Sequence, residues 1–193
     1  MTALPAFTVL MATRNGAAHL PAQLASLAAQ SHSGWRLWVS DDGSTDATRA
    51  LVQDFGRDHD VRLIDGPQRG AAANFMHLLC HPDLPRGPVA LSDQDDIWLP
   101  DKLARAGAAL ARARAPVLYG AGSIHMGADG AARGTSPDWP RGPSFENALV
   151  QNVVSGHSTA LNAAALDIVR QAGVPRGIAF HDWWLDQPMT GAG

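Results

Sequence analysis

Short apolar runs alternate with apolar residues at helical spacing through the first half of the chain. Four runs rich in strand-forming residues lie at 7–13, 36–40, 61–65 and 88–92. Between them, apolar side chains recur as on one face of a helix, at Leu20, Leu24 and Leu27, at Ala47, Ala50 and Leu51, and at Phe75, Leu78 and Leu79. Pro100 lies where a fourth helix would begin. The alternation predicts an α/β fold with a mainly parallel sheet flanked by helices.

The second half of the chain is less regular. Two further strands are predicted at 116–126 and 155–162, with a loop rich in Pro and Gly at 134–143 between them. Residues 164–173 predict a helix that ends at Gly173. We find no internal repeat, so we expect one domain over the whole sequence.

Composition and charge narrow the class of protein. A chain of 193 residues that is 46% hydrophobic and 17% charged is long and apolar enough for one globular core. A net charge of −3 without a basic block argues against nucleic acid as a partner. The single cysteine, Cys80, excludes an internal disulfide and a cysteine-rich zinc site, and it fits a reducing compartment.

Hydropathy bears on location. The N-terminus lacks the basic and long apolar segments of a signal peptide. No stretch reaches the roughly 18 apolar residues that a spanning helix needs. We therefore expect a cytoplasmic protein, at most peripheral to the inner face of the membrane.

Polar clusters follow three of the predicted strands: "TRN" at 13–15, "SDDGSTD" at 40–46 and "SDQDD" at 92–96. Ligands of open α/β sheets bind at the carboxyl ends of the strands, so three clusters there indicate a site. In the second cluster, Ser44, Thr45 or Asp46 can simply cap the next helix. Asp42 can instead accept hydrogen bonds from a ligand, such as a base N–H or ribose hydroxyls.

The third cluster places Asp93, Asp95 and Asp96 within four positions. Carboxylates this close repel one another unless a cation joins them. Mg²⁺ or Mn²⁺ prefers oxygen ligands and often takes only one or two protein carboxylates, with substrate phosphates completing the shell. Asp93 and Asp95 are two apart on what we expect to be an extended segment, so their side chains should point the same way and hold such an ion. The alternative is an acidic loop with a helix cap.

Residues 181–184, "HDWW", form the last candidate. Adjacent tryptophans are often core residues, and His181 with Asp182 can begin a helix. The functional interpretation makes Asp182 a general base beside an aromatic platform for a sugar.

Five segments in order resemble family 2 glycosyltransferases with the GT-A fold: "VLMATRNG", "VSDDGSTDAT", "ALSDQDDIWLPDKL", "QNVVSGHST" and "FHDWWL". The pair "SDQDDIW" and "HDWW" is most similar to the rhamnosyltransferase-like branch of bacterial polysaccharide synthesis. The resemblance spans residues 7–190. It implies inverting transfer of a sugar from a dTDP or UDP type donor to a hydroxyl of a glycan or lipid-linked acceptor. The resemblance to this branch implies that the sugar is rhamnose.

The resemblance also implies roles for individual residues. It makes 1–98 the nucleotide-binding half and 99–193 the acceptor-side half. Asp93 and Asp95 would hold Mn²⁺ or Mg²⁺, and Asp182 would be the catalytic base. The nucleotide or donor would contact Thr13, Arg14, Asn15, Asp41, Asp42, Arg69, Asn74 and Asp96. The acceptor would contact Gly156, His157 and Trp183. Many relatives have tyrosine in place of Arg14, but a guanidinium also stacks on a base.

Relatives of this kind usually continue past the final "TGAG", so we expect the second half to be truncated. This leaves an alternative, a sugar-nucleotide-binding remnant or subunit without turnover of its own. Other classes fit less well. A haloacid-dehalogenase-type phosphatase needs aspartate where Ser40 stands, and a dinucleotide-binding loop needs glycine where His125 stands. A nucleotidyltransferase needs a more basic first loop than "TRNGAAH".

Overall fold

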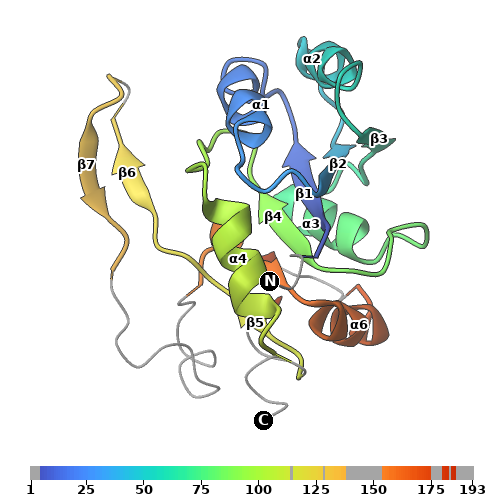
Figure 1. Cartoon of the computed structure of the whole chain (residues 1–193). Helices are drawn as coiled ribbons and strands as arrows, with labels where there is room; N and C mark the ends of the chain where they lie inside the picture. Colours follow the sequence, from blue (N-terminus) through green and yellow to red (C-terminus); the bar gives the residue numbers. More distant parts are fainter. Residues whose placement is uncertain are drawn as a thin grey trace.

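The fold was obtained as a computed structural model (Figure 1). It describes residues 5–113, 115–127, 129–137, 154–174, 180–182 and 184–185. Within these residues, the main sheet has six strands in the order β3-β2-β1-β4-β8-β5. The first four strands along the chain pair with one another in parallel, as the alternating pattern predicts. Among the described residues, every helix is too short or too polar to cross a membrane.

In the first half of the chain, the structure confirms the four predicted strands and the four predicted helices. The strands are β1 (Phe7–Thr13), β2 (Trp35–Asp41), β3 (Val61–Asp65) and β4 (Val89–Ser92). The helices are α1 (Leu20–Ala28), α2 (Thr48–Phe55), α3 (Ala71–Leu79) and α4 (Lys102–Leu110). Helix α4 thus begins two residues after Pro100.

The predicted strand at 116–126 is wrong as a single element. The chain forms β5 (Leu118–Tyr119) in the main sheet and then β6 (Ile124–Met126), which pairs with β7 (Ala132–Thr135) in a separate hairpin. At Gly120, directly after β5, the chain passes so close to Val154 that a Cβ atom would lie 2.6 Å from Val154 Cγ1. The hairpin stands to one side of the main sheet (Figure 1). The loop predicted at 134–143 starts as the end of β7, and its residues 138–143 lie outside the described residues.

The predicted strand at 155–162 is also largely wrong. It consists of a 3₁₀ turn, η1 (Gly156–Ser158), and a short strand, β8 (Ala160–Leu161). The Ser158 and Thr159 hydroxyls both donate to Ser155 O, at 2.8 and 3.1 Å. Such local hydrogen bonds compete with a strand ladder and favour the turn. Helix α6 (Ala163–Ala172) follows and ends before Gly173, which has a φ of 71°, as predicted.

Alternate side chains of the central strands pack on opposite faces of the sheet. On one face, Phe7, Val9 and Met11 of β1 pack with the apolar sides of α1 and α4. On the other, Leu10 and Leu91 pack with α3 and α6. Successive side chains of β1 therefore pack on opposite faces of the sheet. The sheet is the middle of three layers, with helices on both sides.

The pairing of β4 brings the two halves of the sequence together. On one side β4 runs parallel to β1, with Met11 opposite Ser92. On the other side it runs antiparallel to β8, and Leu91 N–H donates to Thr159 O at 2.9 Å. The η1 turn, which directly precedes Thr159, therefore lies beside the end of β4, where the acidic cluster begins.

Asn162 should be important for the stability of this junction. Its Oδ1 accepts from Ala165 N at the start of α6 and from Val117 N, and its Nδ2 donates to Ala115 O. Replacing it with alanine removes a helix cap and leaves these backbone groups without a partner. We expect Asn162→Ala to lower the free energy of unfolding by about 2 kcal/mol in urea titrations. Asn162→Asp keeps the acceptor and should cost less, so equal losses would contradict this assignment.

Candidate active site

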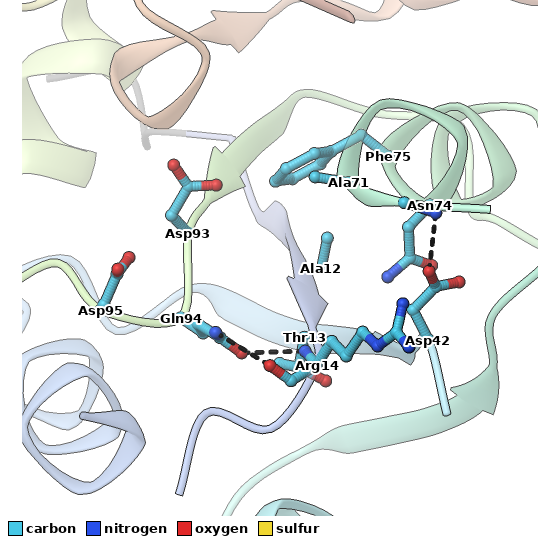
Figure 2. Close-up of a pocket in the computed structure, with 11 residues that line it drawn as sticks. Ala12, Thr13, Arg14, Asp42, Ala71, Asn74, Phe75, Asp93, Gln94 and Asp95 are labelled. Atoms are coloured by element: carbon cyan, nitrogen blue, oxygen red, sulfur yellow. Dashed lines mark hydrogen bonds between the residues drawn. The ribbon is translucent and has the colours of Figure 1, made fainter. Parts of the chain in front are cut away.

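A pocket of about 280 Å³ opens at the carboxyl ends of β1, β2 and β4 (Figure 2). The end of β1 forms its floor, the first turn of α3 one wall, and the loop after β4 the other. The guanidinium of Arg14 extends across it toward Asp42 (Figure 2). The lining residues are Ala12, Thr13, Arg14, Asp42, Gly70, Ala71, Asn74, Phe75, Asp93, Gln94 and Asp95.

Asp42 shapes the wall of this pocket. Its two carboxylate oxygens accept from Gln68 N–H at 2.6 Å and from Gly70 N–H at 2.9 Å, and so fix the loop that leads into α3. Asn74 is buried and donates to Ser40 O at 2.8 Å. Asn74 Oδ1 has no hydrogen-bond partner among the described residues. The predicted donor residues Thr13, Arg14, Asp42 and Asn74 are thus brought together in one pocket.

Four other predicted donor residues do not line the pocket, and one of them, Asp96, belongs to the acidic cluster described below. Asp41 is buried and accepts from Thr13, Ser44 and Arg49. Burial raises the pKa of Asp41, but these hydrogen bonds outweigh it and keep the pKa below its usual value. Asn15 Oδ1 accepts from Thr45 N at 2.8 Å. Asp41 and Asn15 therefore organise the loops behind the pocket, and Arg69 is exposed outside it.

The acidic cluster has a different membership from the predicted pair. Oxygen atoms of Asp93 and Asp96 and a ring nitrogen of His157 all lie within 4.8 Å of one another. The extended geometry expected for Asp93 and Asp95 is wrong, because the chain turns at 94–95. The turn brings Asp96 to the cluster and leaves Asp95 exposed at the pocket rim.

The electrostatics of this cluster favour a bound cation. Burial, and then the charge of Asp96, raises the pKa of Asp93 to about 6, although His157 opposes the shift. Burial also raises the pKa of Asp96, against the influence of His157 and Lys102. Asp96 Oδ2 is buried without a hydrogen-bond partner among the described residues. The two carboxylates suit Mn²⁺ or Mg²⁺, and an imidazole nitrogen is a ligand that Mn²⁺ accepts more readily than Mg²⁺, so the residues present fit a divalent ion, and Mn²⁺ better than Mg²⁺.

Lys102 is a charged neighbour of this cluster that the sequence analysis missed. Its Nζ donates to His157 O at 2.7 Å and lies 4.0 Å from the centre of the Trp98 ring. Burial lowers the pKa of Lys102 to about 8, although Asp96 and Asp93 oppose the shift. A signal was present in the sequence, because a lysine in the first turn of a helix is disfavoured by the helix dipole.

The orientation of His157 depends on the hairpin. One ring nitrogen, Nε2, lies 2.7 Å from Ser123 Oγ, just before β6. Ser123 is in turn joined to Ser136, which follows β7, by two hydrogen bonds. Nothing in the local sequence of Ser123 indicates this contact, which depends on the path of the chain after β5.

Asp182 lies beside the η1 turn. Gly156 N–H donates to Asp182 Oδ2 at 3.2 Å, and a Cβ on Gly156 would lie 2.5 Å from His181 Nε2. The His181 ring stacks on Phe75 of the pocket wall, with centroids 4.2 Å apart. Burial lowers the pKa of His181 to about 4, against the influence of Asp182, so the ring is neutral at pH 7. Trp183, the remaining predicted acceptor residue, lies outside the described residues.

The fold and the site together define a GT-A type domain, with a pocket at the carboxyl edge of a mainly parallel sheet and an acidic cluster beside it. The sequence profile of glycosyl transferase family 2 matches residues 8–167. The chain therefore belongs to glycosyl transferase family 2, as the resemblance implied.

Known proteins are similar to the chain in sequence or in fold. The chain is 34% identical over 101 residues to a dTDP-rhamnosyl transferase, RfbG, of Shigella flexneri. The matched region covers 50% of this chain and 35% of RfbG. The chain superposes on S. aureus TarS in complex with UDP-GlcNAc with a TM-score of 0.72 at 19% identity, covering 96% of this chain and 53% of TarS. For the mannosyltransferase PcManGT of Pyrobaculum calidifontis with GDP-Man and Mn²⁺ the TM-score is 0.68 at 23% identity, over 95% and 51% of the two chains. The chain thus spans between about a third and a half of these proteins.

The raised pKa of Asp93 makes a prediction for stability without added cation. The pKa of Asp93 is about 6 in the folded protein and 3.8 in the usual case. At pH values between these two, Asp93 therefore keeps a proton in the folded protein that it has released in the unfolded chain. The stability that this proton provides is present at low pH and is lost as the pH rises through 6. We therefore expect Asp93→Asn to raise the free energy of unfolding by about 1–2 kcal/mol at about pH 7.5, and by much less near pH 4.

Urea titrations in a chelating buffer at the two pH values measure this difference. Asp58→Asn, at an exposed position after α2, is the matched control and should change stability little at either pH. A loss of stability in Asp93→Asn at the higher pH would contradict the assignment of a repulsive cluster.

Proposed function

We propose that the protein is an inverting glycosyltransferase that moves a sugar from a nucleoside diphosphate sugar to an acceptor hydroxyl. One observation carries the proposal, namely that a pocket able to hold a nucleoside opens next to a cluster of carboxylates fit for a divalent cation. Asp93 belongs to both, since it lines the pocket and contributes to the cluster. A nucleoside diphosphate combines the chemistry that the two parts would recognise.

The pocket is suited to the nucleoside end of the donor. The Arg14 guanidinium offers a planar face for stacking on a base, and the buried Asn74, whose amide donates to Ser40 O, holds the wall beside it in place. The sugar and its diphosphate would extend from there toward Asp93. Under this proposal, residues 1–98 supply most of the donor site, His157 of the second half joins Asp93 and Asp96 around the cation, and other residues of that half serve the acceptor.

The cluster of Asp93, Asp96 and His157 would hold Mn²⁺ or Mg²⁺. When bound, the ion supplies positive charge that stabilises the diphosphate leaving group. Asp95, at the pocket rim, is close enough in sequence to add a water-mediated contact. The Mn²⁺ in the PcManGT complex is consistent with this use of a cation in the same fold.

Asp182 would act as the general base. Gly156 N–H holds one of its carboxylate oxygens, and its neighbour His181 is packed on Phe75 at the pocket wall. The Asp182 carboxylate would take the proton of the acceptor hydroxyl as the hydroxyl oxygen attacks the anomeric carbon. A base on the acceptor side, opposite the leaving diphosphate, gives inversion in a single displacement.

The donor is proposed to be of dTDP or UDP type, and the transferred sugar to be rhamnose. The match to a dTDP-rhamnosyl transferase and the UDP-GlcNAc bound by TarS support a pyrimidine nucleotide. The acceptor is proposed to be a glycan or a lipid-linked sugar in polysaccharide synthesis, reached from the cytoplasmic side. A subunit that binds the donor without turnover is the alternative.

Donor binding provides the first test. We expect dTDP and UDP to bind more tightly with Mn²⁺ than without it, by about tenfold or more, because an ion held by the cluster would offset the negative charge of the diphosphate. Asp96→Asn should abolish most of that difference, and Asp58→Asn should leave it unchanged. Titration calorimetry measures both, and binding of dTDP and UDP that is indifferent to Mn²⁺ in the wild type would refute the assignment of the cluster.

Asp182→Asn separates turnover from donor binding. The amide keeps the size and the hydrogen bond from Gly156 but cannot accept the proton. Transfer should therefore slow by about 10²–10⁴-fold, while donor affinity stays within about twofold. Release of dTDP from dTDP-rhamnose in the presence of acceptor extracts reports the rate. Wild-type turnover in the variant would rule out Asp182 as the base, and no turnover in the wild type would favour the binding subunit.

A further inference from the structure

Gln94 joins two loops that lie far apart in the sequence. It stands between Asp93 and Asp95 after β4, and its side chain reaches the loop after β1 (Figure 2). Its Oε1 accepts from Arg14 N–H at 2.9 Å, and its Nε2 donates to Arg14 O at 3.2 Å. One side-chain amide thus pairs with both backbone groups of one residue, as a neighbouring strand would. We call this pair of hydrogen bonds the Gln94 clasp.

Gly16 provides the space for this clasp. A Cβ on Gly16 would lie 2.3 Å from Gln94 Oε1 and 2.6 Å from its amide carbon. The Gly16 backbone is itself fixed, because its N–H donates to Thr48 Oγ1 at 2.8 Å. The absence of a side chain at Gly16 therefore lets the Gln94 amide pack against a loop that is held from the other side.

Each of the two loops carries a different part of the site. The loop after β1 carries Arg14, whose guanidinium extends across the pocket. The loop after β4 carries Asp93 and Asp96, which belong to the acidic cluster. The Gln94 clasp therefore links the loop that carries Arg14 to the loop that carries Asp93 and Asp96.

We propose that Gln94 is a positioning residue that presets the spacing between the nucleoside pocket and the cation cluster, so that nucleoside diphosphate and divalent cation bind cooperatively. The inference rests on the proposed function. A ligand that must contact both parts at once binds more tightly when their separation is already fixed, because less conformational freedom is lost on binding. Without the clasp, each part could still bind its own ligand, but each would assist the other less.

The chemistry of the side chain is specific to this task. A glutamine amide both donates and accepts, which matches the N–H and C=O of Arg14. Glutamate would only accept, and it would add a third negative charge between Asp93 and Asp95. Methionine has a similar length and neither hydrogen bond, so Gln94→Met removes the clasp with little change of volume or charge.

The test compares two variants that open the clasp from opposite sides. Gln94→Met removes the amide, and Gly16→Ala displaces it with a methyl group while Gln94 stays in place. Calorimetry gives the affinity for UDP and dTDP with saturating Mn²⁺ and without Mn²⁺, and the ratio of the two affinities is the coupling factor. We expect each variant to lower this factor by about fivefold or more, the effect of losing two ordinary hydrogen bonds. Binding of Mn²⁺ alone should stay within about twofold.

Matched controls and a double variant complete the design. Gln53→Met, at an exposed position of α2, controls for the side-chain change. Gly87→Ala controls for the added methyl group, since a Cβ there would only approach Ala6 O, at 3.9 Å. Both should keep the wild-type coupling factor. Because Gln94→Met and Gly16→Ala disrupt one contact, the double variant should lose little more than either single variant.

The possible results are distinct. Variants that keep the wild-type coupling factor, or that weaken the binding of Mn²⁺ alone as strongly as the coupling, would overturn the role of Gln94. Those results leave the proposed function intact, because the wild type still couples the two ligands. A wild type that binds neither UDP nor dTDP would overturn the proposed function, and the role of Gln94 with it.

Discussion

Repulsion between carboxylates held close together is the constraint on which this site depends. Asp93 and Asp96 lie with His157 in a cluster where burial already disfavours charge, and one oxygen of Asp96 has no hydrogen-bond partner among the described residues. A fold without use for a cation would gain stability by moving these groups apart. Lys102, itself largely buried, offsets only part of the repulsion. The cluster therefore makes sense as a site kept ready for an ion that arrives with its ligand.

The position of β4 explains how the fold assembles such a site. On one side β4 pairs with β1 and places the acidic loop at the nucleoside pocket. On the other side it pairs with β8 and brings His157 and Gly156 to the same place. Gly156 then holds Asp182. Under the proposed function, one strand would thus join the three parts that a transfer reaction needs, namely a pocket for the donor, a place for the cation and a base for the acceptor.

Much of this arrangement could be predicted from the sequence. The spacing of apolar residues predicted the strands and helices of the parallel half of the sheet. The polar residues at the strand ends predicted that Thr13, Asp42 and Asp93 belong to the site. Local pattern failed where the chain leaves regular structure. A turn at 94–95 brings Asp96, rather than Asp95, to His157. The contacts of Lys102 and Ser123 depend on how distant segments pack, which no local spacing records. The close approach of Gly120 to Val154 at the end of β5 is equally invisible in the sequence.

The most direct measurement of the central claim is the anomalous scattering of manganese in crystals grown with Mn²⁺ and a pyrimidine nucleoside diphosphate. We expect one strong anomalous peak within coordination distance of Asp93 and Asp96, in contact with the diphosphate. Nucleotide bound in the pocket with no manganese at these two carboxylates would contradict this expectation.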